Sequence, residues 1–229
     1  MKKISRRKFL YIVGALSFSH PLYISAASSR GDKPGENKNF PITYAVLKAA
    51  YESEKVASEH YVGYSRIAVE EKYPNIAYLF SAFAVSEKIH AANYKTILTA
   101  LSSDFKEPQF EILLSDTRAN LTKAAESELK KIKNTYRNFL ARLKEESHDQ
   151  AVISCMYAWK SHRQHRKQIK EIQKYSKQFF GAVAKKLEGM EFDFHVCGVC
   201  GSTMNEAPKT PCDICNYPNS HYQKVIRPA

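Results

Sequence analysis

Apolar side chains recur at helical spacing along four segments of the chain. Positions i, i+3 and i+4 are apolar in each segment, which is the pattern of an amphipathic helix. The first two stripes run through Tyr44, Leu47, Tyr51 and Tyr61, and through Leu79, Phe83, Tyr94 and Ile97. The last two run through Leu121, Ala125, Ile132, Phe139 and Leu143, and through Cys155, Trp159, Ile169 and Ile172. The pattern predicts helices at approximately residues 41–72, 74–102, 112–146 and 148–187.

Polar residues interrupt the first two stripes at positions that should face the core. They are Glu54 on the first helix and Glu87 and His90 on the second. A buried carboxylate costs several kcal/mol unless a cation meets it, and no Lys or Arg shares these stripe positions. A metal ion is therefore the expected counter-charge. If the chain turns near Pro74, Glu54 and His90 lie at the same level along the two helices, and Glu87 lies one helical turn nearer to that turn of the chain.

The second half repeats this arrangement with changes. Its stripes are interrupted by Glu128, His162 and His165. The separations of 33 and 36 residues in the first half become 34 and 37 in the second. An internal duplication of a helical hairpin, in which each copy supplies half of a metal site, explains all four spacings. Between the hairpins, the segment from Ser102 to Glu111 is the only candidate for a long connection. It is short for that task, so early residues of the third helix are expected to complete it.

Two Cys-x-x-Cys pairs near the C-terminus form the most specific motif in the sequence. Cys197 and Cys200 are followed, after eleven residues, by Cys212 and Cys215. Such pairs direct four thiolates toward one tetrahedral metal ion. A pair of disulfides is the less favoured alternative. The fifth cysteine, Cys155, lies on an apolar stripe and is expected to be a small buried residue.

The N-terminus has the features of an export signal. Residues 1–27 begin with a basic stretch, continue through an apolar run too short to span a bilayer and end in small residues. The segment from Ser5 to Leu10 resembles the twin-arginine signature. We therefore expect export to the periplasm without a stable membrane anchor after cleavage; an uncleaved basic N-terminal anchor is the alternative. Residues 28–40 carry Gly, Pro and charge without periodicity and are expected to be a linker.

The formal net charge of +12 partly reflects this signal, which contributes five of the cations. About +7 remains for the rest, spread over helix faces such as Lys130 to Lys133 and Arg163 to Lys170. We interpret these as solvated faces that could receive an acidic electron-donor protein. No nucleic-acid recognition motif accompanies the charge, so nucleic-acid binding is not expected.

The order of these motifs resembles that of the rubrerythrin family. In that order, a Glu on the first helix is followed by a Glu-x-x-His on the second, a degenerate copy on the next two helices and a tail with paired cysteines. The resemblance covers roughly residues 41 to 226. It implies an all-α fold: a ferritin-like four-helix bundle over residues 41–187, followed by a small rubredoxin-like domain over residues 188–229. It also implies a diiron site in the bundle and an Fe(Cys)4 centre at the four paired cysteines. The resemblance places diiron ligands at Glu54, Glu87, His90, Glu128 and His165, and the candidate set also includes His162.

The resemblance further implies an oxidoreductase of the peroxidase type. Its oxidant would be hydrogen peroxide or oxygen, electrons would come from a donor protein, and the relay would cross between the subunits of a head-to-tail homodimer. Zinc is an alternative metal at either site. Tyr61 and Tyr136 are expected to be core residues whose hydroxyls reach carboxylates just outside the ligand set, and either could pass electrons. Four aromatic residues are expected to surround the cysteine site: Phe192, Phe194, Tyr217 and Tyr222.

Two positions depart from the family pattern. A Glu normally stands at the position of His162, and a further carboxylate at the position of Lys131. The site thus offers three carboxylates and three imidazoles, where the family has five and two. Less negative charge should raise the reduction potential or weaken the second iron, so that the sites are unequal or only one metal binds tightly. Two rival functions remain open: a metal-binding protein without turnover, and a zinc-ribbon adaptor on a structural bundle.

Overall fold

The computed structural model describes residues 40–103, 105–189, 191 and 193–229. The predicted signal peptide at residues 1–27 lies outside the described residues, as does the linker except for Phe40. Among the described residues, no helix combines the length and apolar character that crossing a membrane requires.

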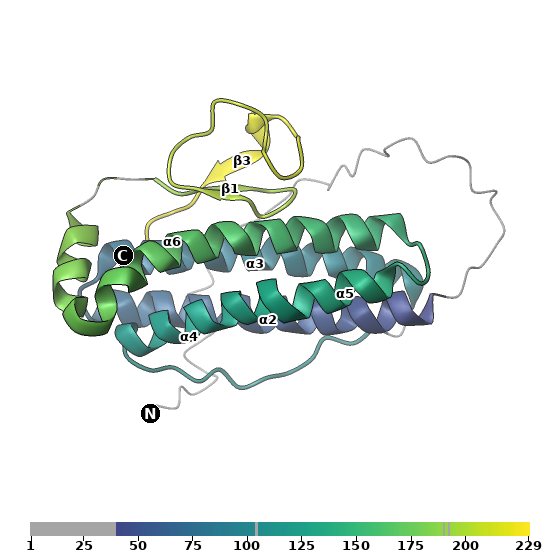
Figure 1. The fold of residues 1–229 in the computed structure, drawn as a ribbon, viewed down its shortest axis with the longest axis horizontal. Helices are drawn as coiled ribbons and strands as arrows, with labels where there is room; N and C mark the ends of the chain where they lie inside the picture. The colour runs from purple at the N-terminus through teal and green to yellow at the C-terminus, as the bar shows by residue number, and fades with distance from the viewer. Residues whose placement is uncertain (1–39, 104, 190, 192) are drawn as a thin grey trace. The chain divides into compact units, whose positions relative to one another are not determined.

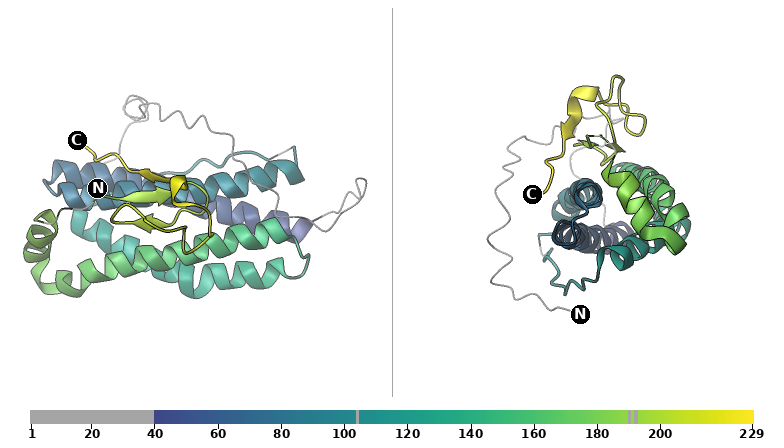
Figure 2. Two further views of the ribbon diagram at one scale, coloured as in Figure 1. Left: turned by 90° about the horizontal axis from the view of Figure 1, so that it is seen from above. Right: turned by 90° about the vertical axis from the view of Figure 1, so that its left-hand side faces the viewer.

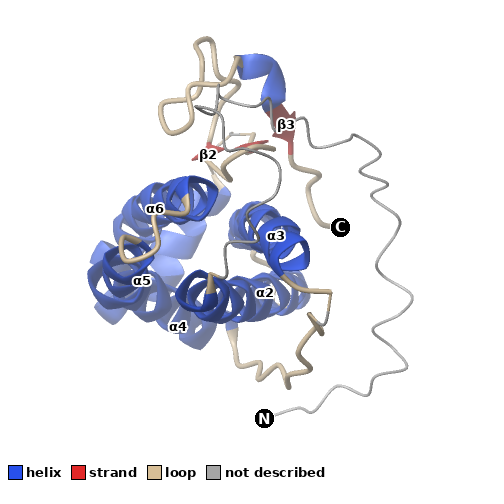
Figure 3. Cartoon of the chain, turned by 90° about the vertical axis from the view of Figure 1, so that its right-hand side faces the viewer, coloured by secondary structure: helices blue, strands red, loops and turns tan. Residues whose placement is uncertain are grey.

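Most of the described chain forms a bundle of four long helical runs (Figure 1). These are α2 (Pro41–Glu70), α3 (Pro74–Leu101), a composite third run and α6 (Asp149–Glu188). The third run consists of α4 (Thr117–Lys130), the π-helix η1 (Lys131–Thr135) and α5 (Tyr136–Leu143). Viewed from one end, α2 and α3 lie beside the pair formed by α4–α5 and α6 (Figure 3). The predicted all-α four-helix bundle is confirmed for the described residues.

Carboxylates from other parts of the chain accept hydrogen bonds from backbone N–H groups at the N-termini of three helices. Backbone N–H groups in the first turn of α2 donate to Glu146, and those of α3 donate to Glu188. The N–H of Thr117, at the start of α4, donates to Glu71. The first N–H groups of a helix have no partner within the helix, and the helix dipole favours negative charge there. These contacts therefore fix how the ends of the helices meet.

The third helical run differs from the continuous helix expected over residues 112–146. It begins at Thr117, where the side chain of Asp116 accepts a hydrogen bond of 2.7 Å from the N–H of Ala119. Residues between α3 and α4 thus form a longer connection than Ser102 to Glu111, as the shortness of that segment suggested. Leu114 anchors this connection by packing against Gly63 of α2, where even a Cβ atom would collide with it.

The C-terminal tail forms a small antiparallel sheet with strand order β2-β1-β3. Its strands are β1 (His195–Cys197), β2 (Thr203–Met204) and β3 (Tyr222–Lys224), and the 3-10 turn η2 (Asn219–His221) precedes β3. The tail contacts α3 and α6 (Figure 2). Phe194, Val196 and Val225 join the apolar core of the bundle, and the Tyr78 hydroxyl donates to the Val225 carbonyl.

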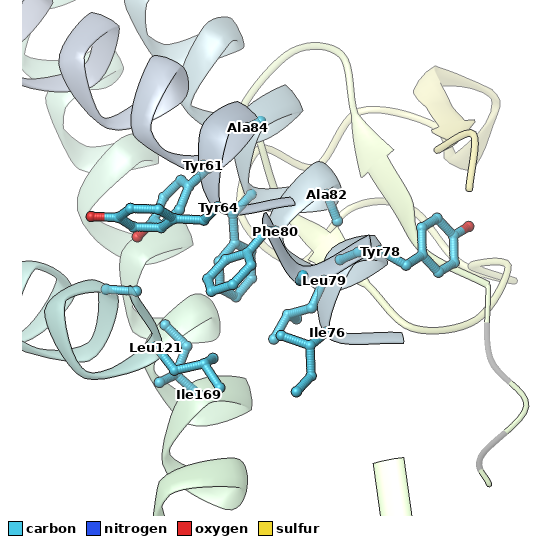
Figure 4. Close-up of a cluster of buried hydrophobic side chains, with 14 of the residues drawn as sticks. Tyr61, Tyr64, Ile76, Tyr78, Leu79, Phe80, Ala82, Ala84, Leu121 and Ile169 are labelled. Atoms are coloured by element: carbon cyan, nitrogen blue, oxygen red, sulfur yellow. The ribbon is translucent and has the colours of Figure 1, made fainter. Parts of the chain in front are cut away.

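Two apolar clusters fill the bundle. One gathers aromatic and aliphatic side chains such as Tyr61, Phe80 and Ile169 (Figure 4). The other includes Leu47, Tyr94 and Tyr136. Buried polar side chains from all four helical runs lie between these clusters, and they contain the candidate metal ligands.

Candidate metal centre

The six predicted bundle ligands come together although they arise from four helical runs. Glu54 lies on α2, Glu87 and His90 on α3, Glu128 on α4, and His162 and His165 on α6. All six are buried. Their ligand atoms form two overlapping groups, each with all its atoms within 4.8 Å of one another: Glu54, Glu87, His90 and His162, and Glu87, Glu128, His162 and His165. Each hairpin of the duplicated pattern thus contributes to both groups.

Hydrogen bonds from the tail fix two imidazoles. His90 Nε2 lies 3.1 Å from the Cys200 carbonyl oxygen, so it must be the donor. His165 Nε2 lies 3.2 Å from Thr203 Oγ1, and that hydroxyl gives its own hydrogen to the Gly201 carbonyl. Each ring therefore carries a proton on Nε2, which leaves Nδ1 as the nitrogen that a metal ion can bind. Fixing the outer nitrogen in this way is how proteins orient histidine ligands.

Several atoms in the centre of the bundle lack hydrogen-bond partners. They are Glu87 Oε1, His162 Nε2 and His165 Nδ1. His90 Nδ1 lies 2.8 Å from Glu87 Oε2, at hydrogen-bond distance when that nitrogen carries a proton. Unsatisfied buried acceptors are costly, and a cation between them removes the cost. Mixed carboxylate and imidazole donors suit iron or zinc, so these residues fit a metal site.

A lysine also reaches this centre, which the helical stripes did not predict. Lys131, the first residue of η1, is buried, and its Nζ lies 2.5 Å from Glu54 Oε2 and 3.5 Å from Glu87 Oε1. The expectation that Lys131 belongs to a solvated basic face was therefore wrong, whereas its place beside the acids agrees with its standing at the position of a family carboxylate. The stripes of α2 and α3 do not reveal it because it comes from a different helix. Its neighbours Lys130 and Lys133 are exposed as expected.

The buried charges shift one another's pKa values. Burial raises the pKa of Glu128, but His162 outweighs this and lowers the pKa to about 2. Burial lowers the pKa of His162, but Glu87 and the other carboxylates prevail and raise it to about 10. For Lys131, burial is likewise outweighed by Glu54, Glu87 and Glu128, and its pKa is raised. The metal-free centre is thus a network of ion pairs.

Two tyrosines are buried in the core as expected, but their hydroxyls bind ligand candidates of the opposite hairpin rather than carboxylates outside the ligand set. The Tyr61 hydroxyl donates to Glu128 Oε1 at 2.7 Å, and the Tyr136 hydroxyl donates to Glu54 Oε1 at 2.6 Å. Tyr61 follows Glu54 by seven residues, whereas Tyr136 follows Glu128 by eight. The π-helix η1 lies within the longer interval, and a π turn accommodates one extra residue. It thereby keeps Tyr136 in the position that corresponds to Tyr61.

The four paired cysteines form the second candidate site. Their sulfur atoms lie within 4.8 Å of one another, and none is disulfide-bonded. Cys197 and Cys215 sulfurs are 3.8 Å apart, and the Tyr222 hydroxyl donates to Cys212 at 3.2 Å. Four buried thiols this close together fit one tetrahedrally coordinated iron or zinc ion.

The apolar surroundings of this site differ in part from expectation. Tyr217 and Tyr222 pack against the cysteines, together with Tyr157 of α6. Phe194 instead packs into the bundle core, where its ring centroid lies 5.1 Å from that of Tyr78 on α3. Phe192 lies outside the described residues. The helical bundle therefore supplies one wall of the cysteine site.

Comparison with known proteins identifies the family. The sequence model of the rubrerythrin family matches residues 45–173, which is more than half of the chain. The chain belongs to the rubrerythrin family. Rubrerythrin-2 of Clostridium acetobutylicum is 28% identical over 183 residues, covering 80% of this chain and 96% of that protein. Nigerythrin of Nitratidesulfovibrio vulgaris is 25% identical over 178 residues, covering 77% and 83% respectively.

Solved structures share the fold of this rubrerythrin-family chain. Nigerythrin in a mixed-valence state superposes with a TM-score of 0.69 at 22% identity, covering 88% of this chain and 96% of that one. A bacterioferritin of Mycobacterium tuberculosis gives a TM-score of 0.58 at 12% identity, covering 66% of this chain and 96% of that one. The ferritin-like bundle and the rubredoxin-like tail are thus confirmed. The carboxylate–histidine site and the four-cysteine site agree with the iron expected for the family.

Sequence analysis missed four residues that join the two sites. Ser86 and Ser161 both donate to the Gly201 carbonyl, at 2.7 and 2.8 Å. Gly201 adopts a φ of +75°, and a Cβ atom there would lie 2.4 Å from His90 Nε2. Thr203 holds His165, as described above. The sequence did hold one sign of the two serines, because they occupy equivalent positions in the duplicated pattern. Ser86 immediately precedes Glu87, and Ser161 immediately precedes His162.

Proposed function

We propose that this rubrerythrin-family protein reduces hydrogen peroxide in the bundle with electrons delivered through the four-cysteine site. Peroxide takes two electrons and two protons and yields two water molecules. The electrons come singly from an external electron-donor protein. The observation that carries the proposal is the 3.1 Å contact between His90 Nε2 and the Cys200 carbonyl, because it joins a ligand candidate of one site directly to a cysteine of the other.

Iron bound at the two sites would supply the one-electron chemistry that no side chain of this chain provides. The protein's own contribution is positioning. Glu54, Glu87 and Glu128 hold negative charge in a buried interior, and His90 and His165 present Nδ1 to it. The serine and threonine contacts to Gly201 keep the cysteine turn against α3 and α6. The basic exposed faces, which include Lys130 and Arg163, suit an acidic donor protein.

The test uses full-length protein purified without added metal and then loaded anaerobically with ferrous iron. Red ferric-thiolate absorbance would identify iron at the cysteines, since zinc there is colourless. Loaded protein is expected to be oxidised by peroxide much faster than by oxygen. Equally slow oxidation by both would rule out the peroxidase function. Cys212→Ser should abolish the red absorbance and the relay while leaving the bundle metal in place.

Lys131 favours a second candidate function, a metal-binding protein without turnover. An ammonium group already neutralises part of the charge in the bundle, which weakens the case for a redox pair of metals. Metal analysis separates the two functions. Iron at both sites with peroxide turnover supports the first, whereas a bundle filled with zinc, or with iron that peroxide does not oxidise, supports the second.

We further propose export to the periplasm by the twin-arginine route and assembly as a homodimer. The support for export is the sequence of residues 1–27, and for dimerisation it is the family resemblance. Replacing Arg6 and Arg7 by Lys in an epitope-tagged chain should retain the protein in the cytoplasm. Wild-type fractionation with cytoplasmic proteins would contradict export. Light scattering of the purified protein tests the dimer.

A further inference from the structure

The two overlapping ligand groups in the bundle are unequal. They share Glu87 and His162. A carboxylate can bridge two metals through its two oxygens, but a neutral imidazole offers a single lone pair. His162 can therefore serve one group only. Its Nδ1 lies 2.9 Å from Glu128 Oε2 and 3.4 Å from Glu87 Oε1, whereas its Nε2 lies 3.4 Å from Glu54 Oε1. We assign Nδ1, the nitrogen with the shorter contacts, to the group with Glu87, Glu128 and His165, which leaves Glu54, Glu87 and His90 in the other group.

Glu54 is already engaged through both of its oxygens. Lys131 Nζ donates to Oε2 at 2.5 Å, and the Tyr136 hydroxyl donates to Oε1 at 2.6 Å. The lysine side chain is 5% exposed, so its ammonium lies inside the bundle, where a metal bound to Glu54 would have to approach. Glu128, in the other group, also makes two contacts, with the Tyr61 hydroxyl at 2.7 Å and with His162 Nδ1 at 2.9 Å, but one of these partners is itself a ligand candidate and neither is a lysine. Lys131 Nζ is farther from Glu87, 3.5 Å from its Oε1, and neither that oxygen nor His165 Nδ1 makes a hydrogen bond.

The charge balance points the same way. Three buried carboxylates and the Lys131 ammonium leave two negative charges, with neutral imidazoles as ligands. One divalent cation neutralises them. A second divalent cation would leave an excess of positive charge in a low-dielectric interior, which is strongly unfavourable. The charge balance therefore favours one divalent ion in the bundle, and the ion pair between Lys131 and Glu54 favours the group of Glu87, Glu128, His162 and His165 as its position.

We infer that the bundle binds one divalent metal tightly, at Glu87, Glu128, His162 and His165, and that the Lys131 ammonium occupies the place of a second metal beside Glu54. The inference rests on the proposed metal binding by the bundle. It adds that Lys131 is a built-in cation that makes the two positions unequal. Two metals enter only when the ammonium leaves Glu54.

The test measures metal binding rather than turnover. Full-length apoprotein is titrated anaerobically with ferrous iron by calorimetry, and metal per chain is counted after desalting. X-ray absorption then reports whether a neighbouring metal lies within about 3.5–4 Å, the spacing of two-metal sites. The variants are Lys131→Met, which removes the charge at similar length, and Lys131→Glu, which supplies a carboxylate. Lys130→Met, which removes the adjacent exposed lysine, is the matched control.

Wild type and Lys130→Met are expected to bind one metal in the bundle and one at the cysteines, without metal–metal scattering. Binding of a second bundle metal should be at least a hundredfold weaker than the first. Both Lys131 variants, refolded with metal if necessary, should strengthen that second step by at least tenfold and show metal–metal scattering. Two bundle metals of equal affinity in wild type would overturn the inference, as would folded Lys131 variants with no gain. A bundle that binds no metal would remove the proposed function as well.

Discussion

Lys131 Nζ lies 2.5 Å from Glu54 Oε2 inside the bundle, and the two residues are 77 positions apart in the chain. The pair is a buried ion pair between the π-helix η1 and α2. Breaking such a pair by removing one partner leaves the other charge buried without compensation. The relationship gives Lys131 a role in the metal-free protein as well as in metal binding.

Lys131→Met should therefore destabilise the metal-free protein by about 3–5 kcal/mol. Urea unfolding of chelator-treated protein, followed by circular dichroism, measures the change. Lys130→Met should stay within about 0.5 kcal/mol of wild type, because that side chain is exposed. Equal stability of the two variants would show that another group compensates the buried negative charge of Glu54.

Gly201→Ala should separate the cysteine turn from the bundle. The new methyl group would lie 2.4 Å from His90 Nε2, and the φ of +75° is unfavourable for alanine. Stopped-flow measurement should show electron transfer from the reduced cysteine site slowed by at least about tenfold, with the ferric-thiolate spectrum unchanged. Gly198→Ala is the control, since its Cβ would meet only the His221 carbonyl at 3.5 Å. Unchanged transfer in Gly201→Ala would argue against a relay through this contact.

Tyr61→Phe and Tyr136→Phe should each lower the stability by at least about 1.5–3 kcal/mol, because each removes one hydrogen bond to a buried carboxylate. Tyr136→Phe should cost the more of the two, because it also removes the hydrogen bond with the Tyr94 hydroxyl. Tyr94→Phe should cost less, about 0.5–1.5 kcal/mol, because its hydroxyl bonds to that of Tyr136, 2.9 Å away, rather than to a carboxylate. Thermal unfolding of the three variants tests the order. A much smaller loss for Tyr136→Phe than for Tyr94→Phe would contradict it.

The stability of the metal-free protein should depend on pH through His162 and Glu128. The pKa of His162 is raised to about 10 from 6.5, so its contribution is full below pH 6.5 and is lost as pH rises toward 10. The pKa of Glu128 is lowered to about 2 from 4.5, so its contribution is full above pH 4.5 and is lost as pH falls toward 2. Both pairs contribute fully between these limits, at pH 4.5–6.5.

Urea midpoints of the metal-free protein at pH 6 and pH 9 test this dependence. Wild type should be less stable at pH 9, and His162→Asn should reduce the difference. His221→Asn is the control because His221 is exposed on the tail. A midpoint that rises from pH 6 to pH 9 in wild type would contradict the assigned shift.

The sequence by itself determined the helical bundle and the identity of the residues that converge in it. Glu54, Glu87 and His90 occupy positions where the 3.6-residue period demands apolar side chains, and the same anomaly recurs at Glu128 and His165. Periodicity reports which side of its own helix a residue faces. Periodicity was therefore sufficient to predict which residues face the shared core. The spacing of the cysteine pairs was likewise sufficient to predict a four-cysteine site in the tail.

Only the tertiary structure decided what meets those residues from outside their own stripe. Lys131 reaches Glu54 from the one π-helical segment of the described chain, and a helical period cannot predict where a π turn will direct a side chain. The contact of Gly201 and Cys200 with His90 joins segments more than 100 residues apart. Its position depends on how the sheet of the tail packs on α3 and α6, because long-range packing and buried charge are properties of the assembled core.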